Sequence, residues 1–350
     1  MSNEYIEVAG RRIGSGEPPY IVAEMSANHG REFQQAVRLL EAAAAAGADA
    51  VKLQTYTPDG LTIDCSNPHF RIDGTIWAGR SLYELYREAS MPWEWQPELK
   101  RIADALGLTL FCTAFDGPSV DFLQRLGTPA YKVASFELVD LPLLRRVGQT
   151  GSPVMLSTGM ATLGEIDEAV RTIRAAGGRQ LMLLKCTSAY PAVAEGMNLR
   201  TIPHLAAAFG VPVGLSDHSL EPAVPVAAIG CGACLIEKHL TLSRALGGPD
   251  SAFSLQPDEF RQMAESVRAA HEALGSVHYG LGEQERASRR FRRSLFVVAD
   301  VPAGAVFSEE NVRSIRPGDG LHPRHLQDVL GRTARTDIAR GTPLCWNHVG

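Results

Sequence analysis

Short apolar runs alternate with longer amphipathic runs over the first 275 residues of the chain. Most of the short runs are continuously apolar, which is typical of strands that are buried on both faces. The eight runs lie at residues 20–25, 50–56, 108–115, 130–136, 153–159, 181–188, 211–217 and 233–239. The pattern therefore predicts eight strands, each separated from the next by helical sequence.

Helix boundary signals flank the segments between these runs. The stretch 31–47 ends at Gly47, a residue suited to the end of a helix, and the stretch 162–178 opens with Thr162 as a cap and Glu165 three residues later. Eight β-α units in series favour a closed (β/α)₈ TIM barrel over an open sheet. An insert rich in Gly, Asp, Asn and Pro follows the second strand at 57–80, and we expect it to be a loop over the barrel mouth.

The pattern changes after Gly275. Residues 276–293 are polar and contain a local basic cluster, whereas residues 294–350 contain short apolar runs separated by Pro and Gly turns. We therefore expect a barrel domain at 1–275, a linker at 276–293 and a compact small domain at 294–350. A domain of that size is marginally stable alone, so docking or dimerisation would help it.

Composition narrows the class of protein. The chain is 45% hydrophobic and 21% charged, with a formal net charge of -5 and both signs mixed throughout, so we expect neither a nucleic-acid partner nor a membrane partner. The N-terminus lacks the pattern of a signal peptide, and the longest apolar run is too short to cross a bilayer. The six cysteines are sparse, which favours a reducing compartment, and we expect a cytoplasmic protein.

Polar residues follow nearly every predicted strand, at the end where barrel enzymes hold their active sites. Taken singly, a lysine there is usually solvated or ion-paired, a hydroxyl is usually a cap, and a histidine is usually structural. Because all of them converge on one mouth, we interpret them as one site. They are Glu24, Lys52, Gln54, Thr113, Lys132, Ser135, Glu137, Ser157, Ser188, Tyr190, Ser216, His218, Glu237 and His239.

Two kinds of chemistry are indicated. His218 and His239 end consecutive strands, so both imidazoles could reach one divalent ion such as Mn²⁺, Co²⁺ or Zn²⁺. The lysines and hydroxyls predict a cradle for a phosphate or a carboxylate. With a carboxylate such as Asp250 or Glu237 nearby to move protons, the set fits addition to an aldehyde or metal-assisted hydrolysis. Neither a P-loop nor a dinucleotide-binding motif is present.

These motifs resemble those of the sialic acid synthase family. AEMSANHG, VKLQTY, YKVASFE, LSTGM, KCTSAYP, GLSDH, IEKH and GGPD occur in the family's order over almost the whole chain. RSIRPGDGL and RGTPL resemble the family's C-terminal antifreeze-like (SAF) domain. The resemblance implies a barrel with a SAF domain that condenses phosphoenolpyruvate with an open-chain amino sugar, releasing phosphate and forming a nine-carbon 2-keto acid.

The resemblance also implies roles for individual residues. His218 and His239 would hold Mn²⁺ or Mg²⁺, and Glu137 would take part in proton transfer. Positions for phosphoenolpyruvate are matched by Lys52, Thr113, Lys132, Ser135, Ser157 and Ser216, and positions for the sugar by Glu24, Gln54, Tyr190 and Asp250. Arg316 matches an arginine that reaches the sugar in the partner subunit, which implies a domain-swapped homodimer. Ser188 departs from the family, where an Asn stands.

Within the family, three stretches look most like pseudaminic acid synthases: EMSANH, PWEWQP (92–97) and GGPDSAFSL (247–255). The expected sugar is then 2,4-diacetamido-2,4,6-trideoxy-L-altrose, and Ala252 and Phe253 would offer apolar surface to its methyl group. The alternatives are N-acetylneuraminate or legionaminic acid synthesis by the same chemistry.

More distant readings remain open: a metal-dependent barrel hydrolase, an aldolase that does not use phosphoenolpyruvate, and a non-catalytic sugar- or ice-binding protein. We expect Glu237 to orient metal-bound water or an imidazole, and Lys238 to be structural on the other face of its strand.

Overall fold

The first compact unit of the molecule is a closed parallel barrel. The computed structural model describes residues 5–350, which divide into two units, one ending at Gly275 and the other beginning at Ser276. The eight barrel strands are hydrogen-bonded in the order β10-β3-β4-β5-β6-β7-β8-β9, which confirms the predicted (β/α)₈ fold. They are β3 (Tyr20–Glu24), β4 (Ala50–Thr55), β5 (Thr109–Ala114), β6 (Tyr131–Val133), β7 (Val154–Ser157), β8 (Leu181–Cys186), β9 (Val213–Asp217) and β10 (Leu235–His239).

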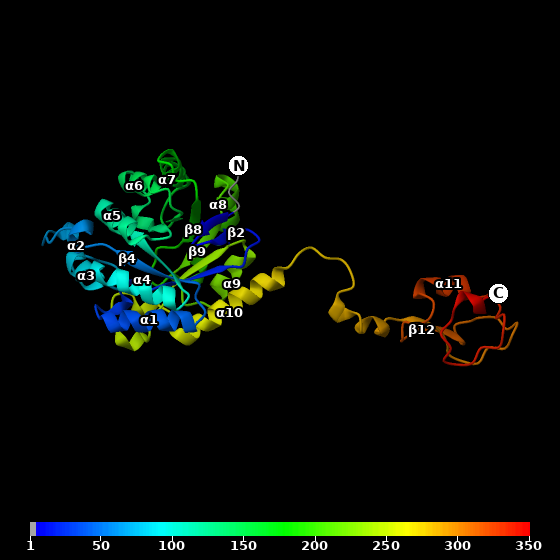
Figure 1. The fold of residues 1–350 in the computed structure, drawn as a ribbon. Coiled ribbons are helices and arrows are strands. Elements are labelled where there is room, and N and C mark those ends of the chain that lie inside the picture. The colour runs from blue at the N-terminus through cyan, green and yellow to red at the C-terminus, as the bar shows by residue number, and fades with distance from the viewer. Residues whose placement is uncertain (1–4) are drawn as a thin grey trace. The chain divides into compact units, whose positions relative to one another are not determined.

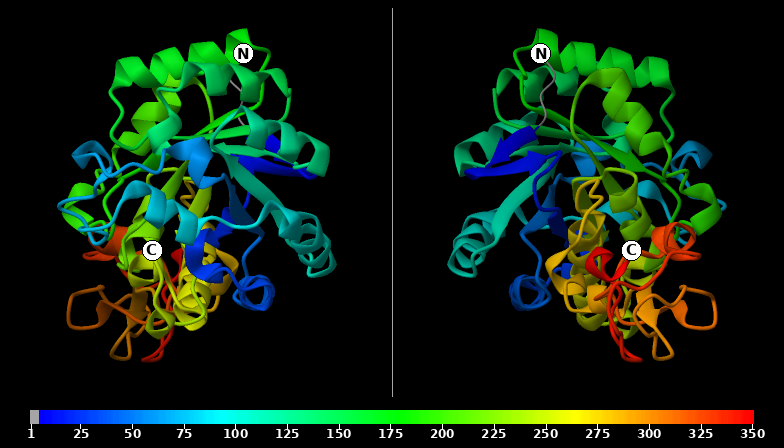
Figure 2. Two further views of the ribbon diagram at one scale, coloured as in Figure 1. Left: turned by 90° about the vertical axis from the view of Figure 1, so that its left-hand side faces the viewer. Right: turned by 90° about the vertical axis from the view of Figure 1, so that its right-hand side faces the viewer.

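Helices surround these strands, as both views of the barrel show (Figures 1 and 2). Their starts carry the expected signals: Thr162, for example, caps α7 and exchanges bonds with Glu165. The helices of this unit are α1 (Phe33–Ala45), α2 (Pro58–Leu61), α3 (Leu82–Ala89), α4 (Gln96–Ala105), α5 (Gly117–Leu126), α6 (Leu141–Gln149), α7 (Leu163–Ala175), α8 (Thr201–Phe209), α9 (Ala223–Gly230) and α10 (Pro257–Leu274). No helix in the described residues is long and apolar enough to span a bilayer.

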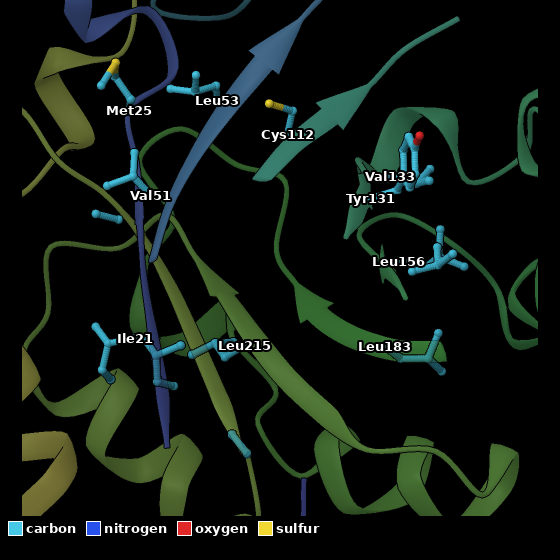
Figure 3. Close-up of a cluster of buried hydrophobic side chains, with 14 of the residues drawn as sticks. Ile21, Met25, Val51, Leu53, Cys112, Tyr131, Val133, Leu156, Leu183 and Leu215 are labelled. Atoms are coloured by element: carbon cyan, nitrogen blue, oxygen red, sulfur yellow. The ribbon is translucent and has the colours of Figure 1, made fainter. Parts of the chain in front are cut away.

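The main hydrophobic core lies between the strands and the helices. Because successive residues of a strand point to opposite faces, one set of strand side chains faces outward. Ile21, Leu53 and Val133 belong to this outward layer, and Figure 3 shows them with their neighbours on the other strands. They pack in one buried cluster with helix residues such as Leu40 and Val170. The opposite, inward-facing set is therefore free to build the site.

A short hairpin that the sequence pattern did not predict joins the barrel's interior. β1 (Tyr5–Val8) pairs antiparallel with β2 (Arg11–Gly14). Ile6, Val8 and Ile13 are buried together with inward-facing apolar residues near the beginnings of the strands, in a cluster separate from the main core. The hairpin thereby adds an apolar base to the interior, and the polar inward residues lie toward the other ends of the strands.

Two expectations about elements differ from the structure. The apolar run 130–136 forms a strand only over Tyr131–Val133, because the chain then turns through a one-turn 3₁₀ helix at Ser135–Glu137 toward α6. The insert 57–80 is not wholly a loop, since it holds α2 and a short 3₁₀ helix, Pro68–Phe70.

The second unit has a small core of its own. β11 (Ser294–Val297) pairs antiparallel with β12 (Val312–Ile315), and α11 spans Leu326–Val329. Ten buried apolar residues form its core, among them Leu295, Phe307 and Val349. Short apolar runs therefore suffice to close a compact unit around a single cluster.

Candidate active site

A cavity of about 370 Å³ opens among the carboxyl ends of the barrel strands. Lys52, Lys132, His218 and His239 line it, together with aromatic residues from the loops. Its lining residues all belong to the first unit. In parallel barrels this end of the strands is where side chains from different strands converge, so the cavity is the candidate active site.

Two buried lysines share one carboxylate at the base of the cavity. The Lys52 ammonium lies 3.2 Å from Glu237 Oε1, and the Lys132 ammonium lies 3.8 Å from the same atom. Lys52 also lies 2.8 Å from Glu24 and donates to Thr113 at 3.1 Å. All four charged side chains are almost wholly buried. Burial of such charges is tolerable only because they are paired.

The charges in this group shift one another's pKa. Although burial opposes the ionisation of Glu237, Lys132 and Lys52 lower its pKa. Burial raises the pKa of Glu24 in spite of Lys52 beside it. Burial lowers the pKa of Lys132, because its one ion pair within the described residues is the long contact with Glu237. Lys132 thus has room for a second anionic partner, which would favour its charged form.

Hydroxyl groups complete this polar surface. Ser216 donates to Glu237 Oε1 at 3.1 Å, and Ser135 accepts from the backbone N–H of Gly159 at 3.1 Å. The buried hydroxyl of Ser157 lines the cavity and has no hydrogen-bond partner among the described residues. A buried hydroxyl without a partner costs free energy, so this group is suited to a ligand.

His218 and His239 stand side by side, with ring centroids 5.2 Å apart. His218 Nδ1 lies 3.1 Å from the carbonyl of Thr187, which can only accept, so Nδ1 carries the proton and Nε2 is left as an acceptor. Burial holds the pKa of His239 well below its usual range, which keeps this imidazole neutral. Burial opposes the charged form of His218, but Cys186 and the Thr187 carbonyl raise its pKa. Metals bind the neutral imidazole, so His218 would release a proton when the pair holds a divalent ion.

The two imidazoles are the only ligands that we assign to an ion from the described residues. Within the described residues, no group of three or more His, Cys, Asp or Glu side chains could hold a metal. His239 Nδ1 is buried and has no hydrogen-bond partner in that part of the chain. Two imidazoles would leave most coordination positions of an ion to water or substrate oxygens, which is an arrangement for an ion that acts on a substrate rather than a structural one.

A second polar group lies beside the imidazoles. The amide of Gln54 donates to Glu24 Oε1 at 3.0 Å and to Ser26 at 2.8 Å, and the Ser26 hydroxyl donates to Asp250. Burial raises the pKa of Asp250. The backbone of Ser26 lies in the left-handed region with φ of 45°, and its hydroxyl is held between Gln54 and Asp250.

Two further groups have unusual acidity. Burial raises the pKa of Glu137 to about 7, and its Oε2 has no hydrogen-bond partner among the described residues. Burial would raise the pKa of Cys186 as well, but His218 lowers it to about 7. Both groups line the cavity, so both lie within reach of a ligand there.

The structure brings most of the predicted site residues together. Twelve of the polar ones line the cavity: Lys52, Gln54, Lys132, Ser135, Glu137, Ser157, Tyr190, Ser216, His218, Glu237, His239 and Asp250. Glu24 and Thr113 do not line it but contact Lys52. Ser188 lies 3.7 Å from the sulfur of Cys186, outside the lining. Arg316 follows β12 in the second unit.

Two details of the sequence interpretation change, those of Glu237 and Ala252. Glu237 was expected to orient metal-bound water or an imidazole, but its hydrogen bond and ion pairs are with Ser216, Lys52 and Lys132. This follows from strand register, because Glu237 lies one inward position below His239. Ala252 is exposed and does not line the cavity, whereas Phe253 is buried and does.

Sequence reasoning missed several lining residues. Ser26, Cys186 and Trp77 are not singled out by strand ends or by motif chemistry. Ser26 could have been found from its place between Glu24 and Asn28, since a turn after a barrel strand faces the mouth. Trp77 belongs to the irregular insert, where no periodicity indicates direction.

Comparison with known proteins agrees with this geometry. Residues 39–279 match the model of the NeuB family, and residues 292–350 match that of the SAF domain. The chain is 43% identical to a pseudaminic acid synthase of Campylobacter jejuni, over 93% of this chain and 95% of that protein. It is 35% identical to an N,N'-diacetyllegionaminic acid synthase of Legionella pneumophila, over 96% of each.

A solved structure gives the same result. The crystal structure of the spore coat polysaccharide biosynthesis protein SpsE of Bacillus subtilis matches with a TM-score of 0.68 and 35% identity, over 99% of both chains. The motifs, the barrel with its polar mouth and the SAF match thus agree, and the chain belongs to the NeuB family.

Proposed function

We propose that the chain condenses phosphoenolpyruvate with 2,4-diacetamido-2,4,6-trideoxy-L-altrose, giving pseudaminic acid and phosphate. The similarity to the Campylobacter jejuni synthase supports the choice of sugar, because it exceeds the similarity to the legionaminic acid synthase by 43% to 35% identity over nearly whole chains. N-acetylneuraminate or legionaminic acid synthesis is the alternative with the same chemistry.

The observation that carries the proposal is the pair of buried lysines on one carboxylate beside two imidazoles. The one anionic partner of Lys132 among the described residues, Glu237, lies 3.8 Å away. Phosphoenolpyruvate carries a phosphate and a carboxylate, and either group would give Lys132 a second anionic partner. The unpartnered Ser157 hydroxyl and Ser135 would donate to the same anion. A hydrolase that does not bind an anion of this kind has no need for both lysines.

The reaction joins the two substrates by a carbon–carbon bond. C3 of phosphoenolpyruvate supplies its electron pair to the aldehyde carbon, water adds at C2, and phosphate leaves with the oxygen that bridged it to C2. Lys52 and Lys132 would hold the phosphate charge before and after the bond breaks. Glu137 would exchange protons, because a carboxyl whose pKa is about 7 holds or releases a proton at neutral pH.

The sugar would occupy the half of the cavity nearer the imidazoles. Gln54, Asp250 and Tyr190 line the cavity and offer hydrogen-bonding groups to hydroxyl and acetamido substituents. His218 and His239 would hold Mn²⁺ or Mg²⁺, which would polarise the aldehyde oxygen. Placing the aldehyde there sets its carbon beside an anion held by the lysines, which is what a condensation needs.

A homodimer with exchanged small domains is part of the proposal. Apolar side chains stand exposed in the segments that follow β6, β7 and β8, including the first residue of α7: Phe136, Val139, Met160, Leu163 and Val193. An apolar rim of this kind around a mouth is suited to cover by another protein surface. The small domain of a second copy would bring Arg316 to the sugar. Mixing inactive His239→Ala with inactive Arg316→Ala chains should restore part of the activity, and no recovery after subunit exchange would contradict the exchange.

We also propose that the enzyme works in the cytoplasm. All six cysteines are free, as is usual in a reducing compartment. Fractionation of the native host with a marker for each compartment checks this.

Phosphate release tests the function. Purified chain is mixed with Mn²⁺, phosphoenolpyruvate and one of three sugars: the L-altrose derivative, the legionaminic acid precursor or N-acetylmannosamine. We expect release with the first sugar and its loss on addition of EDTA. Faster turnover with another sugar would keep the chemistry and overturn the sugar, and release without any sugar would favour a hydrolase.

A further inference from the structure

Trp77 links the insert that follows β4 to the loop that follows β10 by a hydrogen bond. Its indole N–H donates to the carbonyl of Pro249 at 2.8 Å, across 172 residues of sequence. Pro249 precedes Asp250, which lines the cavity beside the imidazoles. The side chain of Trp77 is half-buried and lines the same cavity. The insert is thus held over the mouth by a specific polar bond from an otherwise apolar side chain.

Aromatic rings continue from Trp77 to the imidazole pair. The Trp77 ring lies 5.5 Å from Tyr190 and 6.4 Å from Phe253, centroid to centroid. Phe253 lies 4.9 Å from His239, and Tyr190 lies 4.5 Å from His218. The three aromatic residues therefore form one wall, here called the aromatic wall, that reaches the imidazoles from the insert.

We propose that Trp77 is a specificity-determining residue, and that the aromatic wall of Trp77, Tyr190 and Phe253 selects an amino sugar with a methyl group at C6 over one with a hydroxymethyl group. This rests on the proposed function and deepens it. The lysines and hydroxyls that would bind phosphoenolpyruvate do not distinguish the two sugars. We expect the distinction to be made by the aromatic wall, on the apolar side of the space that the sugar would occupy.

The selection follows from the polar groups of the wall. The indole N–H of Trp77 is already bonded to Pro249, and Phe253 has no polar atom, so this surface offers a sugar hydroxyl no partner from these two residues. A hydroxymethyl group packed against Trp77 and Phe253 loses its hydrogen bonds to water and gains none from these two residues, whereas a methyl group gains contact with their rings. An apolar pocket rejects an added hydroxyl by up to about 100-fold.

Removal of the Trp77 indole should also shift the preference from the C6 methyl sugar toward the C6 hydroxymethyl sugar in a second way. Without Trp77, the carbonyl of Pro249 loses its donor and becomes an acceptor at the cavity edge. A C6 hydroxyl can then donate to it. Smaller side chains at position 77 should therefore favour the hydroxylated sugar both by opening space and by freeing this acceptor.

The experiment compares two sugars that differ in one atom: 2,4-diacetamido-2,4,6-trideoxy-L-altrose and its 6-hydroxy counterpart. The ratio of their kcat/KM values is measured for the wild type, Trp77→Ala and Trp77→Phe. We expect a preference for the deoxy sugar in the wild type, a fall of about tenfold in the ratio for Trp77→Ala, and a smaller fall in the same direction for Trp77→Phe. The KM for phosphoenolpyruvate should change little.

Trp93 offers a matched control. Its indole N–H also donates to a backbone carbonyl, that of Tyr56 at 3.1 Å, but its ring packs on Phe122 and does not line the cavity. Trp93→Phe should keep the wild-type sugar ratio. An unchanged ratio in both Trp77 variants, or an equal fall in Trp93→Phe, overturns the inference while leaving the condensation intact. A wild type that turns over neither sugar overturns the proposed function itself.

Discussion

Asp217 and Lys238 face each other across β9 and β10, each one residue before a histidine of the cavity. They are register partners, and the Lys238 ammonium lies 2.5 Å from Asp217 Oδ2, with side chains 2% and 0% exposed. Lys238 also donates to the carbonyl of Ser219. Since successive residues point to opposite faces, this buried ion pair lies on the outer face of the strands and His218 and His239 on the inner face. The ion pair therefore links β9 and β10 at the positions directly before the two histidines.

Lys238→Met should therefore weaken the fold. Asp217 would remain buried without its cation, which typically costs about 3–5 kcal/mol. Urea unfolding followed by circular dichroism measures the loss. Replacing both partners, as Asp217→Leu with Lys238→Met, should recover a large part of it. A double variant as unstable as the single one would contradict this explanation. Arg101→Gln, which breaks an exposed pair with Glu98 on α4, serves as a control and should leave the curve unchanged.

Lys132→Met should mainly impair the use of phosphoenolpyruvate. Lys132 lacks a close anionic partner in the barrel, so we expect its loss to raise the KM for phosphoenolpyruvate by about 10- to 100-fold, the effect of losing one charge-assisted bond. Steady-state kinetics with each substrate varied in turn measures this. Lys185→Met is the control, because Lys185 bonds to the Cys186 carbonyl and to Thr187 and does not line the cavity. A larger rise in the sugar KM would speak against the anion cradle.

His239→Ala should abolish tight binding of Mn²⁺. The imidazole pair is the only protein contribution we assign to the ion, so one ring alone should hold it weakly. Titration calorimetry and the electron paramagnetic resonance signal of free Mn²⁺ both report binding without catalysis. His204→Ala, on the exposed face of α8, should bind as the wild type does. Unchanged affinity in His239→Ala would place the ion elsewhere.

Glu137 should make folding stability depend on pH. Burial raises its pKa from 4.5 to about 7 in the folded chain, so the folded state holds this proton more tightly than the unfolded state. Its contribution is fully present below about pH 4.5 and is lost as the pH rises toward 7. The difference in unfolding free energy between the wild type and Glu137→Gln, measured from pH 4.5 to 8, should follow this course.

A flat difference over that range would contradict the raised pKa. The same variant has a second use in catalysis. If Glu137 exchanges the proton, the pH profile of kcat/KM should lose its inflection near 7 in Glu137→Gln, while the KM for phosphoenolpyruvate stays within a few-fold of the wild type.

The barrel and its polar mouth could be predicted because the β-α unit, with polar residues after its strand, repeats along the sequence. Each strand alternates between faces, so residues such as Lys52 and Gln54, two apart on β4, had to share the inward face with Lys132 on β6. The end of each strand is marked by the return of polar residues. Lys238 on the opposite face from Glu237 follows from the same alternation, and its buried pairing confirms the structural role expected for it.

Features that depend on contacts between distant segments could not be predicted. The hairpin β1–β2 is too short for a clear alternation, and its burial depends on apolar residues such as Phe111 that come a hundred residues later. The contact of Glu237 with Lys52 rather than an imidazole depends on barrel stagger. The bond from Trp77 to Pro249 joins two irregular loops, whose directions no periodic pattern encodes.

Mass spectrometry of the product tests the central claim most directly, because phosphate release alone does not distinguish condensation from hydrolysis of phosphoenolpyruvate. Purified chain is incubated with Mn²⁺, phosphoenolpyruvate and the L-altrose derivative. We predict one new acid whose mass equals that of the sugar plus pyruvic acid, formed in step with phosphate and absent with His239→Ala. Unchanged sugar together with free pyruvate would contradict the account.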